Sequence, residues 1–166
     1  MKAKLLRLLL LFAILFTMNS CSSDSSEDIT STATTQKEMT YTYNSTEIET
    51  MDLINAYRVS IGLNTLKEID HISYKSEEHD EYMIANNVVN HNDFVSRSQN
   101  IMKVLGAKSV SENIAYNYNS PKAALEAWLK SPSHKENIEG NFTHFGLSIR
   151  VSADGKKYYT NIFAKL

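Results

Sequence analysis

The sequence predicts an α+β fold in which helices come first and an antiparallel β-hairpin comes last. Between residues 46 and 130, apolar residues recur every three or four positions, which is the period of an amphipathic helix. From Phe145 onward the period changes to two, which is typical of a strand. At 166 residues, the chain has room for one domain of ordinary size with extensions.

The first two helices are expected in residues 46–61 and from Asp70 onward. Thr46-x-x-Glu49 has capping-box spacing, and Gly62 is suited to end the first helix. The second helix has a weakly apolar inward face. The positions predicted to face inward are Ile48, Met51, Ile54, Tyr57 and Ile61 in the first helix, and Ile72, Ser76, His79, Met83 and Asn86 in the second.

Two more helices are expected downstream. A short one follows Asp93 and ends at Gly106, and another starts at Ser120, an N-cap followed by a proline at the first helical position. Their inward positions are Phe94, Ile101 and Leu105, and then Ala124 and Trp128.

The C-terminal part predicts a hairpin. Phe145, Leu147, Ile149 and Val151 alternate with Gly146, Ser148, Arg150 and Ser152, which indicates a half-buried strand. Asp154-Gly155 supplies the turn, and "KKYYTNIFAKL" returns as the partner strand. "ENIAYNY" fits a third strand, but Ser109-x-x-Glu112 also fits a capping box, so both interpretations stay open.

The N-terminus predicts export. Residues 1–21 combine a basic start with an apolar run that is short for a membrane span, which is the pattern of a secretory signal. "TMNSCSSD" holds the chain's only cysteine and resembles a bacterial lipobox, in which Cys21 becomes the lipidated first residue of the mature protein. The alternative is an ordinary cleaved signal that leaves Cys21 as a free thiol. With one cysteine, no intrachain disulfide is expected.

Residues 22–46 are rich in Ser, Thr, Asp and Glu and predict a flexible tether, so the folded domain is expected to be 47–166. Removing residues 1–21 takes away three basic and no acidic residues, and the formal charge falls from −2 to −5. A net negative charge argues against nucleic acid or anionic lipid as a general partner. Attachment to a membrane would therefore depend on the acyl chains of Cys21.

Chemistry is left to the histidines and acidic residues, because the chain has no HExxH, CxxC, phosphate-binding loop or nucleophile elbow. His79 lies on the inward face of a helix and is expected to be a core histidine. His71 and His144 are expected to be structural or exposed. His91 lies in the polar loop "NNVVNHNDF", where the fold has little need for an imidazole.

His134 lies in "SPSH", where either Ser131 with Pro132 or Ser133-x-x-Glu136 can start a helix. Both alternatives place His134 in the first helical turn. The positive end of the helix dipole disfavours a protonated imidazole there, which leaves a neutral ring able to bind a metal or accept a proton.

Six blocks occur in order along residues 48–166: "INAYRVSIGLNTL", "NHNDFVSR", "SENIAYNY", "AALEAWLKSPSHKENI", "HFGLSIRV" and "YYTNIFAK". Together they resemble the CAP superfamily, also called SCP-like or PR-1-like, in its bacterial branch. The resemblance implies an α-β-α sandwich with a small antiparallel sheet flanked by helices. It also implies a surface cleft that contains His91, Glu112 and His134. The second cleft acid and the disulfides of eukaryotic relatives have no counterpart here.

The residues of this cleft allow three kinds of chemistry. His91 and His134, with Glu112, suit a divalent cation such as zinc, whose bound water can be activated for hydrolysis. His134 and Glu112 can instead act as an acid–base pair, or Glu112 can fix an imidazole structurally. Clefts of this type in the family are often proposed to bind metals, sterols, lipids or peptides.

Three functions follow from the cleft. We rank first a non-catalytic binding module on the cell envelope, which binds a divalent cation and an apolar or peptide ligand. A metal-assisted, peptidase-like hydrolase that uses the same cleft is second. An envelope or adhesion protein with an inert cleft is third.

Overall fold

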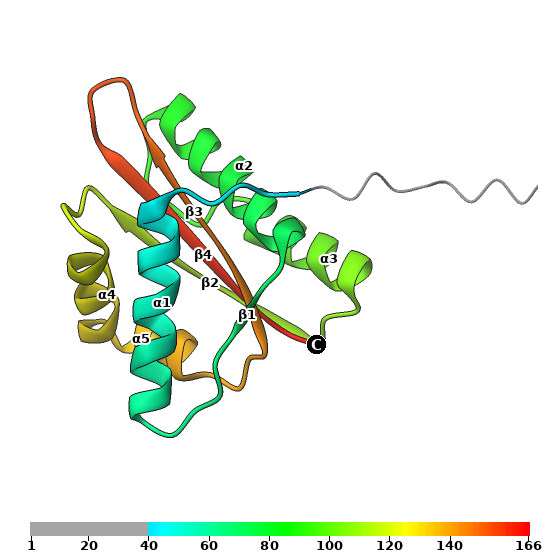
Figure 1. Cartoon of the computed structure of the whole chain (residues 1–166). Coiled ribbons are helices and arrows are strands. Elements are labelled where there is room, and N and C mark those ends of the chain that lie inside the picture. The colour runs from blue at the N-terminus through cyan, green and yellow to red at the C-terminus, as the bar shows by residue number, and fades with distance from the viewer. Residues whose placement is uncertain (1–39) are drawn as a thin grey trace, which may run out of the picture. The chain divides into compact units, whose positions relative to one another are not determined.

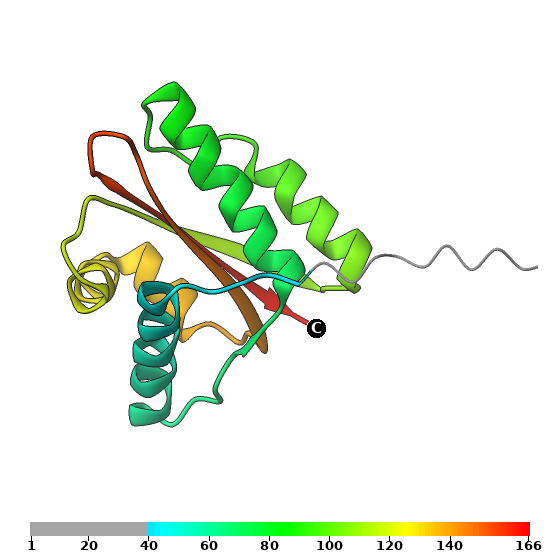
Figure 2. The same ribbon diagram turned by 45° about the horizontal axis from the view of Figure 1, so that its top comes forward.

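The computed structural model describes residues 40–166 and has an α-β-α architecture (Figure 1). Helices α2 and α3 cover one face of a four-stranded sheet, and α1, α4 and α5 cover the other (Figure 2). The elements in chain order are α1 Ser45–Ser60, β1 Lys67–Glu68, α2 Asp70–Asn86, α3 Phe94–Leu105, β2 Ser109–Tyr116, α4 Pro121–Lys130, α5 Pro132–Glu139, β3 His144–Val151 and β4 Lys157–Lys165. The predicted fold class is confirmed.

The sheet has the strand order β1-β3-β4-β2, and β4 pairs antiparallel with both β2 and β3. β1 pairs in parallel with only the first two residues of β3. "ENIAYNY" is therefore strand rather than helix, and β2 is an outer strand of the sheet. Gly155, at a φ of 80°, lies in the predicted turn between β3 and β4.

Helix α1 starts earlier than predicted. Asn44, not Thr46, is the N-cap: its side chain accepts bonds from the backbone of Thr46 and Glu47, and Glu47 bonds back to the N–H of Asn44. The same three-residue spacing thus occurs two positions earlier, where the glutamate is also fully buried. Gly62 ends the helix as expected, at a φ of 82°.

Strand β3 is buried on both faces, so the prediction of a half-buried strand is wrong. Gly146 and Ser148 lie against α2, while Phe145 and Leu147 face the opposite helical layer. A Cβ at Gly146 would come within 2.3 Å of the Ser73 backbone nitrogen, so α2 packs this closely because residue 146 is glycine.

The folded region also includes residues 40–46, which were expected to belong to the tether. Tyr41 is buried, its N–H donates to Asp70, and the Tyr43 hydroxyl is bonded to Ser73. Two aromatic side chains give this segment the apolar area that its polar neighbours lack.

Apolar clusters of buried residues lie on both faces of the sheet. One contains Trp128, whose indole N–H donates to the Ile114 carbonyl at 2.9 Å, and another contains Ile72 and Ile101. Most predicted inward positions contribute to these clusters. Four are exposed instead, and each lies near an end of its element: Ile48, Ile61, Asn86 and Val151.

Candidate functional site

The outer strand β2 brings together the two histidines of the predicted cleft. Glu112 and Asn113 are consecutive in β2, so their side chains point to opposite faces of the sheet. Glu112 contacts His91, from the loop between α2 and α3, and Asn113 contacts His134, from α5. One short stretch of strand therefore holds a residue from each helical layer.

Glu112 is buried and paired with an arginine. Its two oxygens accept bonds of 2.9 Å from Nε and Nη2 of Arg97, in α3, which is a bidentate ion pair. Arg97 also donates to the carbonyl of Asn92 at 2.6 Å. The carboxylate of Glu112 is thus neutralised and oriented from within the fold.

His91 uses one ring nitrogen for this pair and leaves the other for the cleft. Its Nδ1 lies 2.9 Å from Oε1 of Glu112, and its side chain is 50% exposed. The carboxylate already accepts two bonds from Arg97, so Nδ1 is the donor and Nε2 is the free acceptor. The ring is held in the tautomer that suits binding through Nε2.

His134 lies in the first turn of α5, as predicted, with Ser131 as N-cap and Pro132 next. Its carbonyl accepts a 2.9 Å bond from Nδ2 of Asn113, and Asn137 in turn donates to Oδ1 of Asn113 at 2.8 Å. Partial burial, and then the charge of His91, lower the pKa of His134. This imidazole is therefore neutral at pH 7, as the helix-start argument anticipates.

The three predicted residues do not form a three-ligand metal shell. Within residues 40–166, no three His, Cys, Asp or Glu side chains lie close enough together to hold a metal ion. Glu112 pairs with His91 and Arg97, so the alternative acid–base pair of Glu112 with His134 is not formed. What remains for a ligand is Nε2 of His91 and the imidazole of His134.

A hollow of about 460 Å³ opens beside His91. It is lined by the start of α3 and the loop before it, and it combines apolar Phe94 and Val95 with polar side chains such as Asn92 and Gln99. Val95 is 68% exposed, so its apolar surface is available to a ligand in this hollow. A second hollow, of about 400 Å³, lies on the outer side of α1 and contains no histidine.

The remaining histidines have the structural roles that the sequence suggests. His79 is 2% exposed and its Nε2 lies 2.7 Å from the Asn90 carbonyl. His71 contacts Asn100 in α3, and His144 contacts Thr143. The prediction that His79 is a core histidine is confirmed.

The sequence reasoning missed Arg97 and Asn113. Arg97 precedes Ile101 by four residues and so falls on the inward stripe of α3, where a buried arginine needs an acidic partner. The position of Arg97 could therefore have predicted a buried ion pair. The sequence gives no such signal for Asn113, because its bond to His134 depends on α5 lying against the edge of β2, and the two residues are 21 positions apart.

A sandwich of this topology, with two histidines at an outer strand that contains a buried glutamate, is the arrangement that the resemblance implies. The sequence profile of CAP, the cysteine-rich secretory protein family, matches residues 51–163. The chain therefore belongs to the CAP family.

Bacterial relatives agree with this assignment. The uncharacterized membrane protein YlbC of Bacillus subtilis (strain 168) is 32% identical over 126 residues, covering 72% of this chain and 34% of YlbC. An extracellular protein containing an SCP domain from Bacillus anthracis str. Ames is 28% identical, with a TM-score of 0.62 over 73% of this chain and 40% of its own. The chain thus spans about a third of the curated relative.

An outer surface protein of Borrelia burgdorferi has the same fold, with a TM-score of 0.62 at 23% identity, over 69% of this chain and 88% of that protein. Relatives thus include one named as extracellular and one named as a membrane protein. In residues 40–166, none of the helices is both long and apolar enough to span a bilayer.

Proposed function

We propose that this protein is a non-catalytic binding module held on the bacterial cell envelope, which binds a divalent cation and an apolar or peptide ligand at the His91–His134 cleft. The observation that carries the proposal is the engagement of both Glu112 oxygens by Arg97. A carboxylate held in a buried bidentate pair is a poor general base, since accepting a proton would break that pair. The site thus favours binding over hydrolysis.

The donor set fits a weakly held cation. Nε2 of His91 and the imidazole of His134 are the two ligands, and Glu112 orients the first of them in a carboxylate–histidine arrangement that favours metal binding. Zinc suits imidazole donors and takes four ligands, so two positions are left for water or for a carbonyl oxygen of the ligand. A bound cation would supply a Lewis acid that polarises such a carbonyl.

The hollow beside His91 is suited to the second ligand. Phe94 and Val95 offer apolar surface, while Asn92 and Gln99 offer amide groups that pair with a peptide backbone. An acyl chain or sterol would use the apolar side chains alone. We favour a peptide with one apolar side chain, because both kinds of surface line the same hollow.

Zinc titration of the full-length chain tests the cation site. We expect binding in the wild type, none in the double variant His91→Ala/His134→Ala, and undiminished binding in the matched control His71→Ala/His144→Ala. Zinc binding that survives loss of His91 and His134 would remove the cleft from the proposal. A wild type that binds no zinc would favour the inert-cleft alternative.

One observation favours the hydrolase as a second candidate. The 2.9 Å contact of His91 with Glu112 is the histidine–carboxylate pair that orients a general base in many hydrolases. If the chain cleaves peptides, Glu112→Gln should abolish turnover even at zinc concentrations that saturate the variant. Turnover that is unchanged in Glu112→Gln would exclude this carboxylate both as the base and as the group that orients it.

The envelope attachment depends on Cys21, which lies outside the described residues. We propose that it carries the lipid anchor, and that the acidic mature chain needs acyl chains because it has no net basic charge to hold an anionic membrane. Metabolic labelling with a fatty-acid analogue should mark the wild type and not Cys21→Ser. Equal labelling of the two chains would contradict the anchor.

A further inference from the structure

The loop between α2 and α3 delivers His91, and the residue just before His91 is held by a buried imidazole. Nε2 of His79 lies 2.7 Å from the carbonyl oxygen of Asn90. A carbonyl only accepts, so Nε2 carries the proton and donates. Nδ1 of His79 is buried and has no partner among the described residues. The ring therefore makes a single hydrogen bond, and that bond goes to the loop.

The residue just after His91 is held as well. Tyr82, one turn further along α2, stacks on His79 with ring centroids 5.7 Å apart, and its hydroxyl accepts a 3.0 Å bond from the side chain of Asn92. From the other side, Arg97 donates to the Asn92 carbonyl at 2.6 Å. The backbone is thus fixed both immediately before and immediately after His91.

These bonds matter because they tie the loop to the two neighbouring helices, whereas the bonds from the Asn92 N–H to Oδ1 of Asn90 and from the Phe94 N–H to the His91 carbonyl span only a few residues of the chain. His91, Asn92 and Asp93 are exposed, and Asp93 has a left-handed backbone with a φ of 56°. A polar loop of this kind gains little from apolar burial, so its conformation depends on its hydrogen bonds. The direction in which the His91 ring points follows from that conformation.

We propose that His79 and Tyr82 are positioning residues, which hold the α2–α3 loop so that His91 keeps Nδ1 on Glu112 and leaves Nε2 open to the cleft. This role stands on the loop geometry alone. Its consequence for cation binding rests on the function proposed above.

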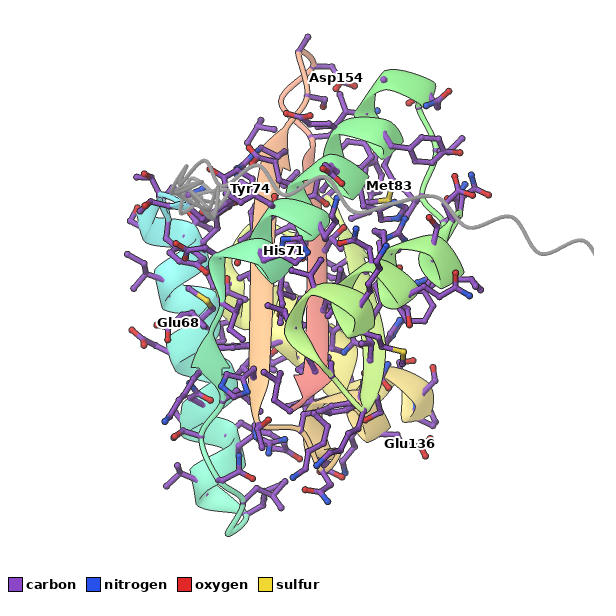
Figure 3. The ribbon with its side chains drawn as sticks, turned by 90° about the vertical axis from the view of Figure 1, so that its right-hand side faces the viewer. Glu68, His71, Tyr74, Met83, Glu136 and Asp154 are labelled. Atoms are coloured by element: carbon purple, nitrogen blue, oxygen red, sulfur yellow. The ribbon has the colours of Figure 1, made fainter. Side chains whose placement is uncertain are left out.

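The chain offers matched variants for a test. In His79→Gln, the side-chain amide nitrogen reaches about as far as Nε2 of histidine and can still donate to Asn90, whereas His79→Leu fills the space without a donor. His71→Leu is the control. His71 lies on α2 near its N-terminal end, and Met83 lies toward the end that leads into the loop (Figure 3). His71 contacts Asn100 rather than the loop.

The readout is the tautomer of His91, measured from the imidazole ¹⁵N shifts of the full-length chain labelled at histidine. The spectra are recorded at about pH 8, because the ¹⁵N shifts of a neutral imidazole distinguish its two tautomers. We expect His91 to be almost wholly in the Nδ1–H form in the wild type, His79→Gln and His71→Leu. In His79→Leu we expect a mixture of both forms.

A folded His79→Leu in which His91 keeps the Nδ1–H form would overturn the proposal, because a purely structural role would lower the thermal midpoint without changing the tautomer. Loss of the Nδ1–H form in His79→Gln to the same extent as in His79→Leu would overturn it too. Should His79→Leu fail to fold, Tyr82→Phe replaces it, since this change removes only the hydroxyl. A smaller shift in the same direction supports the proposal, and an unchanged tautomer contradicts it.

Zinc titration of the same variants separates this role from the cation site. Zinc binds only the Nδ1–H form of His91, so an equal mixture of the two tautomers predicts about a twofold loss of apparent zinc affinity in His79→Leu and none in His71→Leu. A tautomer that shifts while zinc affinity stays the same would leave the positioning role standing and refute the cation site. An unchanged His91 tautomer together with a reduced zinc affinity would refute the positioning role.

Discussion

Each outer edge of the sheet carries a buried glutamate paired with an arginine, and the two pairs differ in what completes them. At the β2 edge, Glu112 pairs with Arg97. At the β3 edge, beyond the short reach of β1, Glu47 pairs with Arg150. Both glutamate side chains are at most 1% exposed. The chain thus uses the same ion-pair chemistry twice.

The β3 pair is closed by the fold itself. Oε1 of Glu47 accepts from the Tyr41 hydroxyl, the Ile149 N–H and Arg150, and Oε2 accepts from the Asn44 N–H. The bond to Ile149 satisfies a strand N–H that has no neighbouring strand at that point. Arg150, whose side chain is 25% exposed, is held in turn by a second carboxylate, Glu77. All of these partners come from the fold itself, so this pair serves stability.

The β2 pair is open on one side. Beyond Arg97, the remaining partner of the Glu112 side chain is His91, whose own side chain is half exposed. The two ion pairs thus differ in one kind of partner. Internal donors complete the structural pair, whereas a solvent-facing imidazole completes the pair that orients a site. This contrast predicts different consequences for the same substitution at the two glutamates.

The largest effect is expected for Glu47→Gln, which removes the charge that four donors share. Breaking one partner out of a buried ion pair costs about 3–5 kcal/mol, and with four bonds affected we expect the upper end of that range in the free energy of unfolding. Urea denaturation measures it. Zinc affinity should not change, because the cleft lies at the other edge.

The control for this change is Glu49→Gln, an exposed glutamate on the same helix, which should stay within about 0.5 kcal/mol of the wild type. If Glu47→Gln and Glu49→Gln had equal stability, the closed pair would not be a stabilising feature.

The next effect is expected for Glu112→Gln, which loses fewer bonds. We expect about 3 kcal/mol lower stability, since the Arg97 guanidinium keeps its bond to Asn92 but loses its charged partner. Here zinc affinity should also fall, by about tenfold, because the amide oxygen that replaces the carboxylate is an uncharged and weaker acceptor for Nδ1 of His91. Exposed Glu136, on α5, gives the control Glu136→Gln. If the Glu112→Gln chain kept the zinc affinity of the wild type, the ion pairs at both edges would have only a structural role.

The local signals in the sequence predicted most of the fold. Asp93, Gly106 and Ser120 mark helix ends by their own backbone preferences or caps, and the structure places α3 and α4 at these positions. The change of period at Phe145 likewise predicted β3. Such signals act within a few residues, so no knowledge of the partner element is needed.

The features that were missed depend on distant partners. Small residues at Gly146 and Ser148 suggested a solvent-facing side, whereas they permit the close approach of α2. In the site, the family resemblance identified His91, Glu112 and His134, but the ion pair that neutralises Glu112 requires α3 to lie across β2. The sequence shows that residue 112 is a glutamate, but not whether its carboxylate is free to bind a ligand or is paired with an arginine.

The smallest and most specific effect concerns pH at the closed edge. Asp80 of α2 is fully buried, and burial raises its pKa well above the ordinary value of 3.8, against the opposing effect of the Thr160 hydroxyl that donates to Oδ1. The Ser148 hydroxyl and the charge of Arg150 also lower this pKa, whereas the charge of Glu47 raises it. The folded state therefore favours the protonated acid.

A raised folded-state pKa means that folding takes up a proton once the pH exceeds 3.8, the value expected in the unfolded chain. The contribution of Asp80 to stability is complete below that pH and is lost as the pH rises through the folded-state value. Asp80→Asn removes this titration, so the stability of the variant relative to the wild type should increase with pH above 3.8, as measured by urea denaturation at several pH values. Asp52→Asn, at an exposed position of α1, should show a constant difference. A constant difference for Asp80→Asn as well would mean that this carboxyl is ionised in the folded protein, and that its negative charge joins those of Glu47 and Glu77 around Arg150 at the closed edge.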